Sequence, residues 1–288
     1  MTDEVRHSPE RSNDDERSHA RTPATSRRPG FNEGAETMLI RNKTAVVTGA
    51  ASGIGAAIAE RLAEEGAHVI LTDVDDARGN ELTTRLTDRG RKASYLHCDS
   101  GNLESIAAMT ARAVAENGSV DVLVNNAGVT RKIKLLDLTP ADWDWIQNVN
   151  TRGLFFTMQG FARHMAEAGG GVIVNIASIA GKGAKATSNA SYAASKAAAI
   201  VMSRVAANEL GGSGIRVNAV CPGATRTALL DDLEKANPVG FRKMLEETAL
   251  GRFASPRDIA DAVLFLASDL SSSITGQSIN VDNGLMWD

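Results

Sequence analysis

Tyr192 and Lys196 stand four residues apart in the run Tyr-Ala-Ala-Ser-Lys, and this spacing places both side chains on one face of a helix. A free tyrosine loses its proton near pH 10, so it is a poor base at neutral pH. A nearby ammonium favours the phenolate and lowers the pKa of the phenol. The pair could therefore act as a general acid/base, in which Tyr192 exchanges the proton and Lys196 tunes it. Alone it is a weak signal, because this spacing is common on helix surfaces.

Two further polar residues precede the pair. Ser178 ends a predicted strand 14 residues before Tyr192, and Asn150 closes the run Asn-Val-Asn. A serine hydroxyl can donate a hydrogen bond to a substrate oxygen and stabilise a developing alkoxide. Taken singly, Asn150 is more often a turn or cap residue, and Ser178 is an ordinary hydroxyl at the end of a strand.

A glycine-rich turn follows the first predicted strand, in the run Thr-Gly-Ala-Ala-Ser-Gly-Ile-Gly. Gly49 permits a tight turn out of the strand, Gly53 lets the backbone approach a pyrophosphate, and Gly55 allows the next helix to pack closely on the sheet. The N-terminus of that helix carries a partial positive charge that favours phosphate. The turn therefore predicts a dinucleotide site.

Asp73 closes the second predicted strand, 18 residues after Gly55. A carboxylate there can accept hydrogen bonds from both hydroxyls of an adenosine ribose, and it would repel a 2′-phosphate. No Arg or Lys occupies residues 50–52, and Val74 follows Asp73. The sequence therefore favours NAD over NADP. A solvated Asp at the beginning of a turn is the alternative.

Short apolar runs alternate with helical patterns from about residue 39 onwards. The predicted strands are residues 44–48, 68–72, 93–97, 120–124, 172–177, 215–220 and 278–281. The predicted helices include residues 54–65, 77–89, 103–116, 143–165 and 191–210. Such alternation implies a mostly parallel sheet covered on both faces. We therefore predict one α/β domain, a doubly wound parallel sheet of about seven strands with helices on both faces.

Composition bounds the function. Residues 1–38 are rich in Arg, Asp, Glu, Ser and Pro and predict a disordered tail before a catalytic domain at 39–288. The net charge of −4 gives no basis for binding nucleic acid or an anionic membrane. No run approaches the roughly 20 apolar residues of a membrane span. Cys98 and Cys221 are isolated in the sequence, which predicts a protein of the reducing cytoplasm. The five histidines lack the spacing of metal ligands, so we predict no metal site.

The spacing Thr-Gly-x-x-x-Gly-x-Gly resembles that of the short-chain dehydrogenases/reductases (SDRs), and the resemblance covers nearly all of residues 39–288. Further motifs follow in the family's order: Cys-Asp-Ser, Asn-Asn-Ala-Gly and Pro-Gly-x-x-x-Thr. The resemblance implies a Rossmann-type fold. The cofactor-binding residues that it implies, together with those argued above, are Gly49, Ser52, Gly53, Ile54, Gly55, Asp73, Asp99, Ser100, Asn126, Ala127, Gly128, Tyr192, Lys196, Pro222, Gly223 and Thr227.

The resemblance also assigns chemistry. In the family, the residues that match Asn150, Ser178, Tyr192 and Lys196 form the catalytic tetrad. Lys196 would also hold the nicotinamide ribose, and Asn150 would hold a water that relays protons from Lys196. The implied reaction is hydride transfer between NAD(H) and a secondary alcohol or ketone, such as a polyol, a sugar or a hydroxy acid.

The family is typically oligomeric, so a homotetramer or homodimer with a small-molecule substrate is expected. Trp143 and Trp145 lie on the helix that pairs subunits in many members. We expect them in the core or in a subunit interface rather than stacked on the substrate.

Two positions depart from the commonest family pattern. Thr151 follows Asn150 where an aliphatic residue is usual, and Asn283 replaces a Gly in the run Val-Asp-Asn-Gly. Asn tolerates a left-handed backbone better than most residues, so the turn at 283 should survive.

The substrate side is less determined. Residues 224–254 are predicted to form a mobile lid. Its candidate apolar lining residues are Leu229, Leu230, Leu233 and Phe241. The loop 179–190 contains Lys182 and Lys185 and is predicted to be solvated; a contact with a polar or acidic substrate is the alternative.

Two other functions stay open. An NADPH-dependent 3-oxoacyl-thioester reductase is the alternative within the enzyme class; Arg131 is mildly suggestive of it, and Asp73 argues against it. A non-catalytic regulator that binds the dinucleotide is the alternative from another class. Such proteins often lose the Tyr or the Lys, and both are present here.

Overall fold

The computed structural model describes residues 38–183, 188–227, 230, 234–235 and 237–287. Contacts divide the chain into Met1–Thr37 and Met38–Asp288, and all described elements belong to the second unit. The predicted disordered tail therefore lies outside the described residues, apart from Met38.

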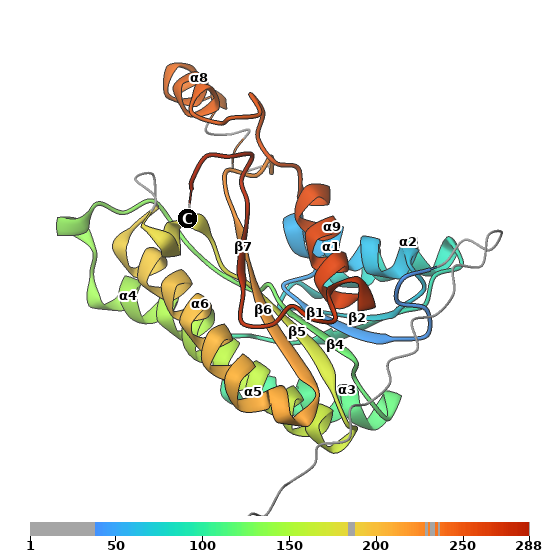
Figure 1. Cartoon of the computed structure of the whole chain (residues 1–288). Coiled ribbons are helices and arrows are strands. Elements are labelled where there is room, and N and C mark those ends of the chain that lie inside the picture. Colours follow the sequence, from blue (N-terminus) through green and yellow to red (C-terminus); the bar gives the residue numbers. More distant parts are fainter. Residues whose placement is uncertain (1–37, 184–187, 228–229, 231–233, 236, 288) are drawn as a thin grey trace, which may run out of the picture. The chain divides into compact units, whose positions relative to one another are not determined.

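Seven parallel strands form one sheet in the order β3-β2-β1-β4-β5-β6-β7 (Figure 1). The strands are β1 Thr44–Thr48, β2 His68–Asp73, β3 Ala93–His97, β4 Val122–Asn125, β5 Gly171–Ile176, β6 Ile215–Pro222 and β7 Ser278–Val281. The chain reverses its direction of travel across the sheet between β1 and β4, and folds of this kind bind ligands at the carboxyl ends of such strands. The predicted doubly wound, seven-stranded α/β sheet is confirmed.

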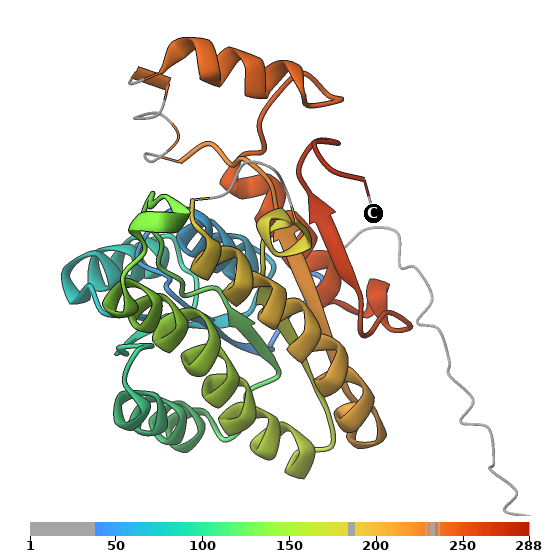
Figure 2. The same ribbon diagram turned by 90° about the vertical axis from the view of Figure 1, so that its left-hand side faces the viewer.

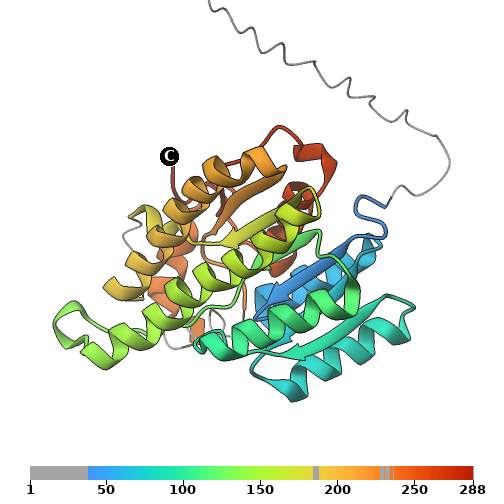
Figure 3. The same ribbon diagram turned by 90° about the horizontal axis from the view of Figure 1, so that it is seen from below.

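Helices cover both faces of the sheet. The described helices are α1 Gly53–Glu64, α2 Asp76–Asp88, α3 Leu103–Asn117, α4 Pro140–Gln147, α5 Leu154–Glu167, α6 Ala190–Leu210, α8 Pro238–Glu246 and α9 Pro256–Ala267. Alternate residues of β1 divide between the faces, because Ala45 and Val47 pack with α1 and α9, whereas Val46 packs with α3 and α5. Figure 3 shows α3, α5 and α6 side by side over the second face. No described helix is both long and apolar enough to cross a membrane.

The single helix predicted over residues 143–165 is wrong. α4 ends at Gln147, the π-helical segment η2 (Asn148–Gly153) follows, and α5 begins at Leu154. The apolar pattern runs through the interruption, so periodicity could not reveal it. At Gly153 a Cβ atom would lie 1.9 Å from the Ser100 carbonyl oxygen, so this turn passes against the loop that follows β3. Single-turn π segments often occur at functional sites.

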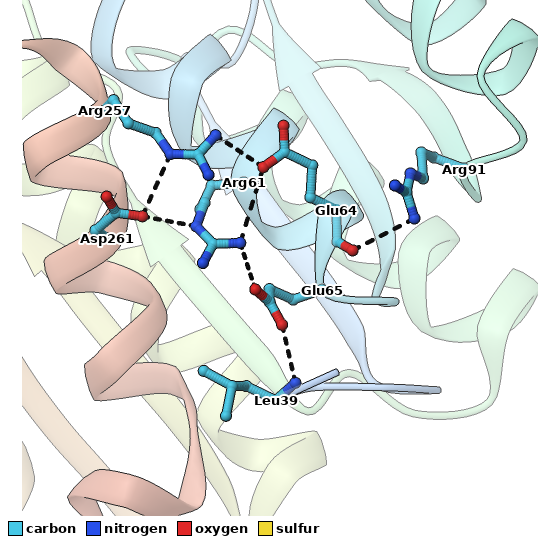
Figure 4. A network of polar contacts seen from close by, with 7 residues as sticks. All are labelled: Leu39, Arg61, Glu64, Glu65, Arg91, Arg257 and Asp261. Atoms are coloured by element: carbon cyan, nitrogen blue, oxygen red, sulfur yellow. Dashed lines mark hydrogen bonds and ion pairs between the residues drawn. The ribbon is translucent and has the colours of Figure 1, made fainter. Parts of the chain in front are cut away.

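A polar network joins α1 to α9 on the surface of the domain (Figure 4). Arg61 of α1 contacts Asp261 of α9 at 2.6 Å and also pairs with Glu65. The second oxygen of the Glu65 carboxylate accepts the Leu39 N–H at 3.0 Å. The network therefore ties the start of the described domain to α1.

Helix α8 lies beyond the carboxyl edge of the sheet (Figure 2). Leu230, Phe241 and Phe253 form a small buried cluster beside it, in which the two phenyl rings meet edge to face at 4.9 Å. Two of the predicted lid residues, Leu230 and Phe241, are thus buried together in this cluster and do not line an open cavity. The other two, Leu229 and Leu233, lie outside the described residues.

Candidate active site

A cavity of about 840 Å³ lies at the carboxyl ends of the central strands. Its lining includes all sixteen predicted cofactor-binding residues, from Gly49 to Thr227, and also Ser178. The structure therefore brings together two sets of residues that are up to 178 positions apart in the sequence. Asn150 does not line the cavity; it lies buried behind Gly128.

The glycine-rich turn lies between β1 and α1. Gly49 and Gly53 have φ angles of +63° and +56°, which side chains other than glycine rarely adopt. A Cβ atom on Gly55 would lie 2.0 Å from the Gly49 carbonyl oxygen, so helix and turn meet backbone to backbone. The Ser52 side chain makes no capping hydrogen bond to the first turn of α1. The positive end of α1 thus faces the cavity in the way that a pyrophosphate site requires.

Asp73 ends β2 and lines the same cavity. The Ala51 N–H donates to its Oδ2 at 2.9 Å, and the Asp75 N–H donates to its Oδ1 at 3.0 Å. These bonds orient the carboxylate beside the glycine-rich turn. Arg78 of α2 also lines the cavity, with its Nε 3.5 Å from the Asp75 carboxylate. Arg78 is thus a basic residue on the same wall of the cavity as Asp73, which the residues next to the turn did not reveal.

The Asn-Asn-Ala-Gly loop after β4 forms hydrogen bonds with the end of β1 and the start of the glycine-rich turn. Asn126 Nδ2 donates to the carbonyl oxygens of Thr48 and Gly49, both at 2.9 Å. The Thr48 hydroxyl accepts the N–H groups of Asn126 and Ala127, both at 3.0 Å. Asp99 is exposed at the rim of the cavity.

Asn150 sits in η2 with 1% of its surface exposed. The Val129 N–H donates to its Oδ1 at 2.7 Å, and its Nδ2 donates to the Val129 carbonyl oxygen at 2.9 Å and to Ser195 Oγ at 3.1 Å. A Cβ atom on Gly128 would lie 3.3 Å from Lys196 Nζ and 3.4 Å from Asn150 Oδ1. Asn150 and Lys196 therefore flank Gly128, and the amide group holds the strand-end loop in place.

Lys196 is buried, and its Nζ donates to the Ile176 carbonyl oxygen at 2.8 Å. The same Nζ lies 5.7 Å from the centroid of the Tyr192 ring. Burial lowers the pKa of Lys196 from 10.5 to about 8. Burial also raises the pKa of Tyr192, and a hydrogen bond with Ser178 opposes that rise. The lowered tyrosine pKa predicted from the sequence is thus not found, because burial disfavours the charged form of both groups.

The N-terminus of α6 holds Tyr192 in place. Asn189 caps the helix by accepting the Tyr192 N–H at 2.7 Å, and its Nδ2 donates to the Arg131 carbonyl oxygen at 2.8 Å. One turn later, Ser195 Oγ donates to the Tyr192 carbonyl oxygen at 2.7 Å. The tyrosine therefore lies in the first turn of α6, and this turn is anchored to the loop after β4.

Sequence reasoning missed part of the lining. The unassigned residues include Arg78, Cys98, Val129, Thr130, Trp145 and Val149. Trp143 and Trp145 are 42% and 41% exposed, so neither lies in the core of this chain. The Arg131 guanidinium lies 5.3 Å from the Trp145 ring centroid. The four-residue spacing of Trp145 and Val149 could have shown that they share a helix face.

The turn after β7 supports the nicotinamide end of the predicted site. Asn283 has a φ of +57°, so the prediction that it keeps the left-handed turn is confirmed. A Cβ atom on Gly223 would lie 2.5 Å from the Asp282 Cβ, so the Pro-Gly segment packs directly on this turn. Lys182 Nζ donates to the Ser278 carbonyl oxygen at 2.9 Å, whereas Lys185 lies outside the described residues.

The family model described as enoyl-(acyl carrier protein) reductase matches residues 49–286. The cis-4-hydroxycyclohexanecarboxylate dehydrogenase of Sinomonas cyclohexanicum is 42% identical over 244 residues, 84% of this chain and 96% of that protein. The 3-oxoacyl-[acyl-carrier-protein] reductase FabG of Thermotoga maritima is 39% identical over 251 residues, 86% of this chain and 100% of that protein. The crystal structure of gox2181 superposes with a TM-score of 0.83 at 35% identity and covers 86% of this chain and 97% of its own. The chain therefore belongs to the short-chain dehydrogenase/reductase family of oxidoreductases, as its motifs predicted.

Proposed function

We propose that this protein is an NAD-dependent oxidoreductase that interconverts a secondary alcohol and a ketone. The observation that carries the proposal is the single cavity that contains the glycine-rich turn, Asp73, and the group of Ser178, Tyr192 and Lys196. One end fits a dinucleotide, and the other end fits proton exchange with an alcohol oxygen. Polyols, sugars and hydroxy acids are the substrate classes that we favour, and the dehydrogenase of a hydroxycyclohexanecarboxylate among the relatives supports the last.

The residues present fit the cofactor. The backbone contact between Gly49 and Gly55 leaves no room for a side chain, so the turn can lie against a pyrophosphate at the positive end of α1. The oriented carboxylate of Asp73 is suited to accept hydrogen bonds from ribose hydroxyls. When bound, the nicotinamide accepts or supplies the hydride.

The protein supplies the proton chemistry. Tyr192 exchanges a proton with the substrate oxygen, and Ser178 donates a hydrogen bond to the same oxygen. Lys196, whose pKa is about 8, carries a positive charge at pH 7 beside the tyrosine ring and stabilises the phenolate when the proton leaves. Asn150 fixes the backbone of Val129 and, through Ser195, the first turns of α6.

A substrate panel tests the activity. Sugars, polyols, hydroxy acids, steroids and acyl thioesters are offered with NAD⁺ or NADH, and turnover is followed by NADH absorbance. Tyr192→Phe, which removes only the hydroxyl, should lower turnover by about 10²–10⁴-fold while the dinucleotide still binds. A protein that binds NAD but turns over nothing, or whose cellular role survives Tyr192→Phe, would instead be a non-catalytic regulator.

Cofactor preference is tested separately. Asp73→Ala should remove the preference for NADH over NADPH, because a charged hydrogen bond to the ribose contributes about 1.5–3 kcal/mol. Arg78→Ala is the comparison variant on the same wall of the cavity, and it should lower turnover with NADPH more than turnover with NADH. A wild-type protein that strongly prefers NADPH would contradict the NAD assignment. Arg78 would then be the observation that favours the 3-oxoacyl-thioester reductase.

We further propose a cytoplasmic homo-oligomer. The outer faces of α5 and α6 expose Phe155, Phe156, Val201 and Val205, between 37% and 56% each, and burial of such side chains favours association. Within the residues that the structure describes, Cys98 and Cys221 are buried and form no disulfide, which suits a reducing compartment. Light scattering should give the mass of a dimer or a tetramer, and a monomer at micromolar concentration would contradict this part of the proposal.

A further inference from the structure

A chain of hydrogen bonds joins η2 to the first turn of α6. The Thr151 hydroxyl donates to Gln147 Oε1 at 2.6 Å. Gln147 Nε2 donates to the carbonyl oxygen and to Oγ of Ser191, at 2.9 and 3.0 Å. Ser191 Oγ donates in turn to the Trp143 carbonyl oxygen at 3.4 Å. Each hydroxyl and amide group in the chain thus finds a partner in one consistent direction.

This chain ends beside the proposed acid/base. Ser191 is completely buried and directly precedes Tyr192. On the other side of Tyr192, Ser195 accepts a hydrogen bond from Asn150 and donates one to the tyrosine carbonyl oxygen. Two sets of bonds therefore hold α6, one from Gln147 at the end of α4 and one from Asn150 of η2, and Tyr192 lies between Ser191 and Ser195 in the sequence.

Thr151 completes the hydrogen bonding of the Gln147 amide. The Ser191 carbonyl oxygen can only accept, so Nε2 must point toward it and Oε1 must point away. The Thr151 hydroxyl supplies the hydrogen that Oε1 then needs. An aliphatic side chain at residue 151 could not supply it, so Thr151 is the group that holds the Gln147 amide on the side away from α6.

We infer that Thr151 is a positioning residue for Tyr192, acting through Gln147 and Ser191. The inference rests on the proposed function in one respect, since it takes Tyr192 to be the proton-exchanging group. Without the hydroxyl, the Gln147 amide is held only through its Nε2, so the contact with Ser191 weakens, the first turn of α6 loosens, and the phenol leaves its aligned position. A misplacement of this kind lowers the rate of the chemical step more than it weakens binding.

Nuclear magnetic resonance can test this without turnover, because the chain has only two tyrosines, Tyr95 and Tyr192. Labelling Tyr Cζ with ¹³C gives one signal from each, and Tyr95 in β3 serves as an internal reference. Thr151→Val, which keeps the shape but removes the hydroxyl, should move the Tyr192 signal and lower the pKa of its phenol toward the ordinary value. The direction follows from burial, which raises this pKa in the intact structure.

Two matched variants control the test. Thr151→Ser keeps the hydroxyl and should leave the Tyr192 signal near its wild-type position. Thr84→Val removes a threonine hydroxyl on α2 that donates to its own helix at 3.0 Å, and it should move neither signal. If Thr151→Val does not fold, as judged by thermal unfolding, Gln147→Met breaks the same tie and takes its place.

Measurements of turnover then test whether the position of Tyr192 affects the reaction rate. With a substrate from the panel, Thr151→Val should lower kcat about ten-fold and leave the KM for NAD unchanged, and Thr151→Ser should restore the rate. An unmoved Tyr192 signal in Thr151→Val overturns the inference, whatever the rate. If the signal moves but the wild-type protein turns over no substrate, the positioning stands and the proposed function fails.

Discussion

Two polar networks of the domain are built in opposite ways. Around Asn150, Ser195 and Lys196 the groups are at most 5% exposed and bond mainly to backbone atoms and hydroxyls. Between α1 and α9 the groups are charged, and the side chains of Arg61 and Asp261 are 17% and 52% exposed (Figure 4). Water can replace a partner lost from the second network but not one lost from the first.

Because of this difference in burial, we expect the first network to determine the geometry of the site and the second to contribute only to the stability of the fold. A buried group whose partner is removed stays unpaired, so only one arrangement of the first network satisfies all its hydrogen bonds. The network therefore fixes the positions of the residues next to the cavity. An exposed ion pair contributes little and is screened by salt, so the second network can vary without moving the site. Substitutions in the two networks should therefore affect different measurements.

The largest effect is expected at Lys196. Lys196→Met should lower turnover by about 10²–10⁴-fold, because the ammonium beside Tyr192 is lost. At pH 7 the variant should be at least as resistant to urea as the wild type. Burial lowers the pKa of Lys196 from 10.5 to about 8, so below pH 8 the folded wild type carries a charge that destabilises it by about 3 kcal/mol.

The pH dependence gives the sign of this effect. Between pH 8 and 10.5 the unfolded chain keeps a proton that the folded chain has lost, so wild-type stability rises with pH through that range. The advantage of Lys196→Met should therefore shrink from pH 7 to pH 10 in urea unfolding. A variant that is less stable than the wild type at pH 7 would show that the bond to Ile176 outweighs the cost of burial.

Asn150→Leu should have the next largest effect, and it acts on stability as well as turnover. It leaves the N–H and C=O groups of the partly buried Val129 without their side-chain partner, and each unpaired group that water does not reach costs about 1–3 kcal/mol. We expect the free energy of unfolding to fall by about 3 kcal/mol. Asn117→Leu is the matched control, because its Nδ2 donates to the carbonyl oxygen of Ala113 in its own helix, outside the network around Asn150. Equal losses in the two variants would mean that the buried position of Asn150 adds nothing to the cost of losing an amide.

The features that could be predicted from the sequence are those that neighbouring residues of the backbone determine. The turn at Gly49 and the shared face of Tyr192 and Lys196 follow from φ preferences and helical spacing, and the order of strands and helices follows from the apolar pattern. The turn at Asn283 was predictable for the same reason. These features need only neighbouring residues.

The rest depends on contacts between distant elements. Gln147 and Ser191 are 44 residues apart, and Asn150 and Val129 are 21 apart, and only the packed register brings them together. The interruption at η2 is hidden because the apolar pattern continues through it. The raised pKa of Tyr192 was missed for a related reason, since spacing shows the charge nearby but not the burial that opposes it.

The smallest effect is expected in the surface network. Arg61→Met removes contacts to both Asp261 and Glu65, and because two partners are lost together the free energy of unfolding should fall by about 1 kcal/mol. Arg112→Met, which breaks a single exposed pair with Glu116, should cost about 0.3–0.5 kcal/mol. Both losses should shrink in urea unfolding at 1 M salt, where the screening length falls to about 3 Å, and neither should change turnover. A loss of turnover in Arg61→Met would mean that the α1–α9 contact, and not only the buried network, sets the geometry of the cavity.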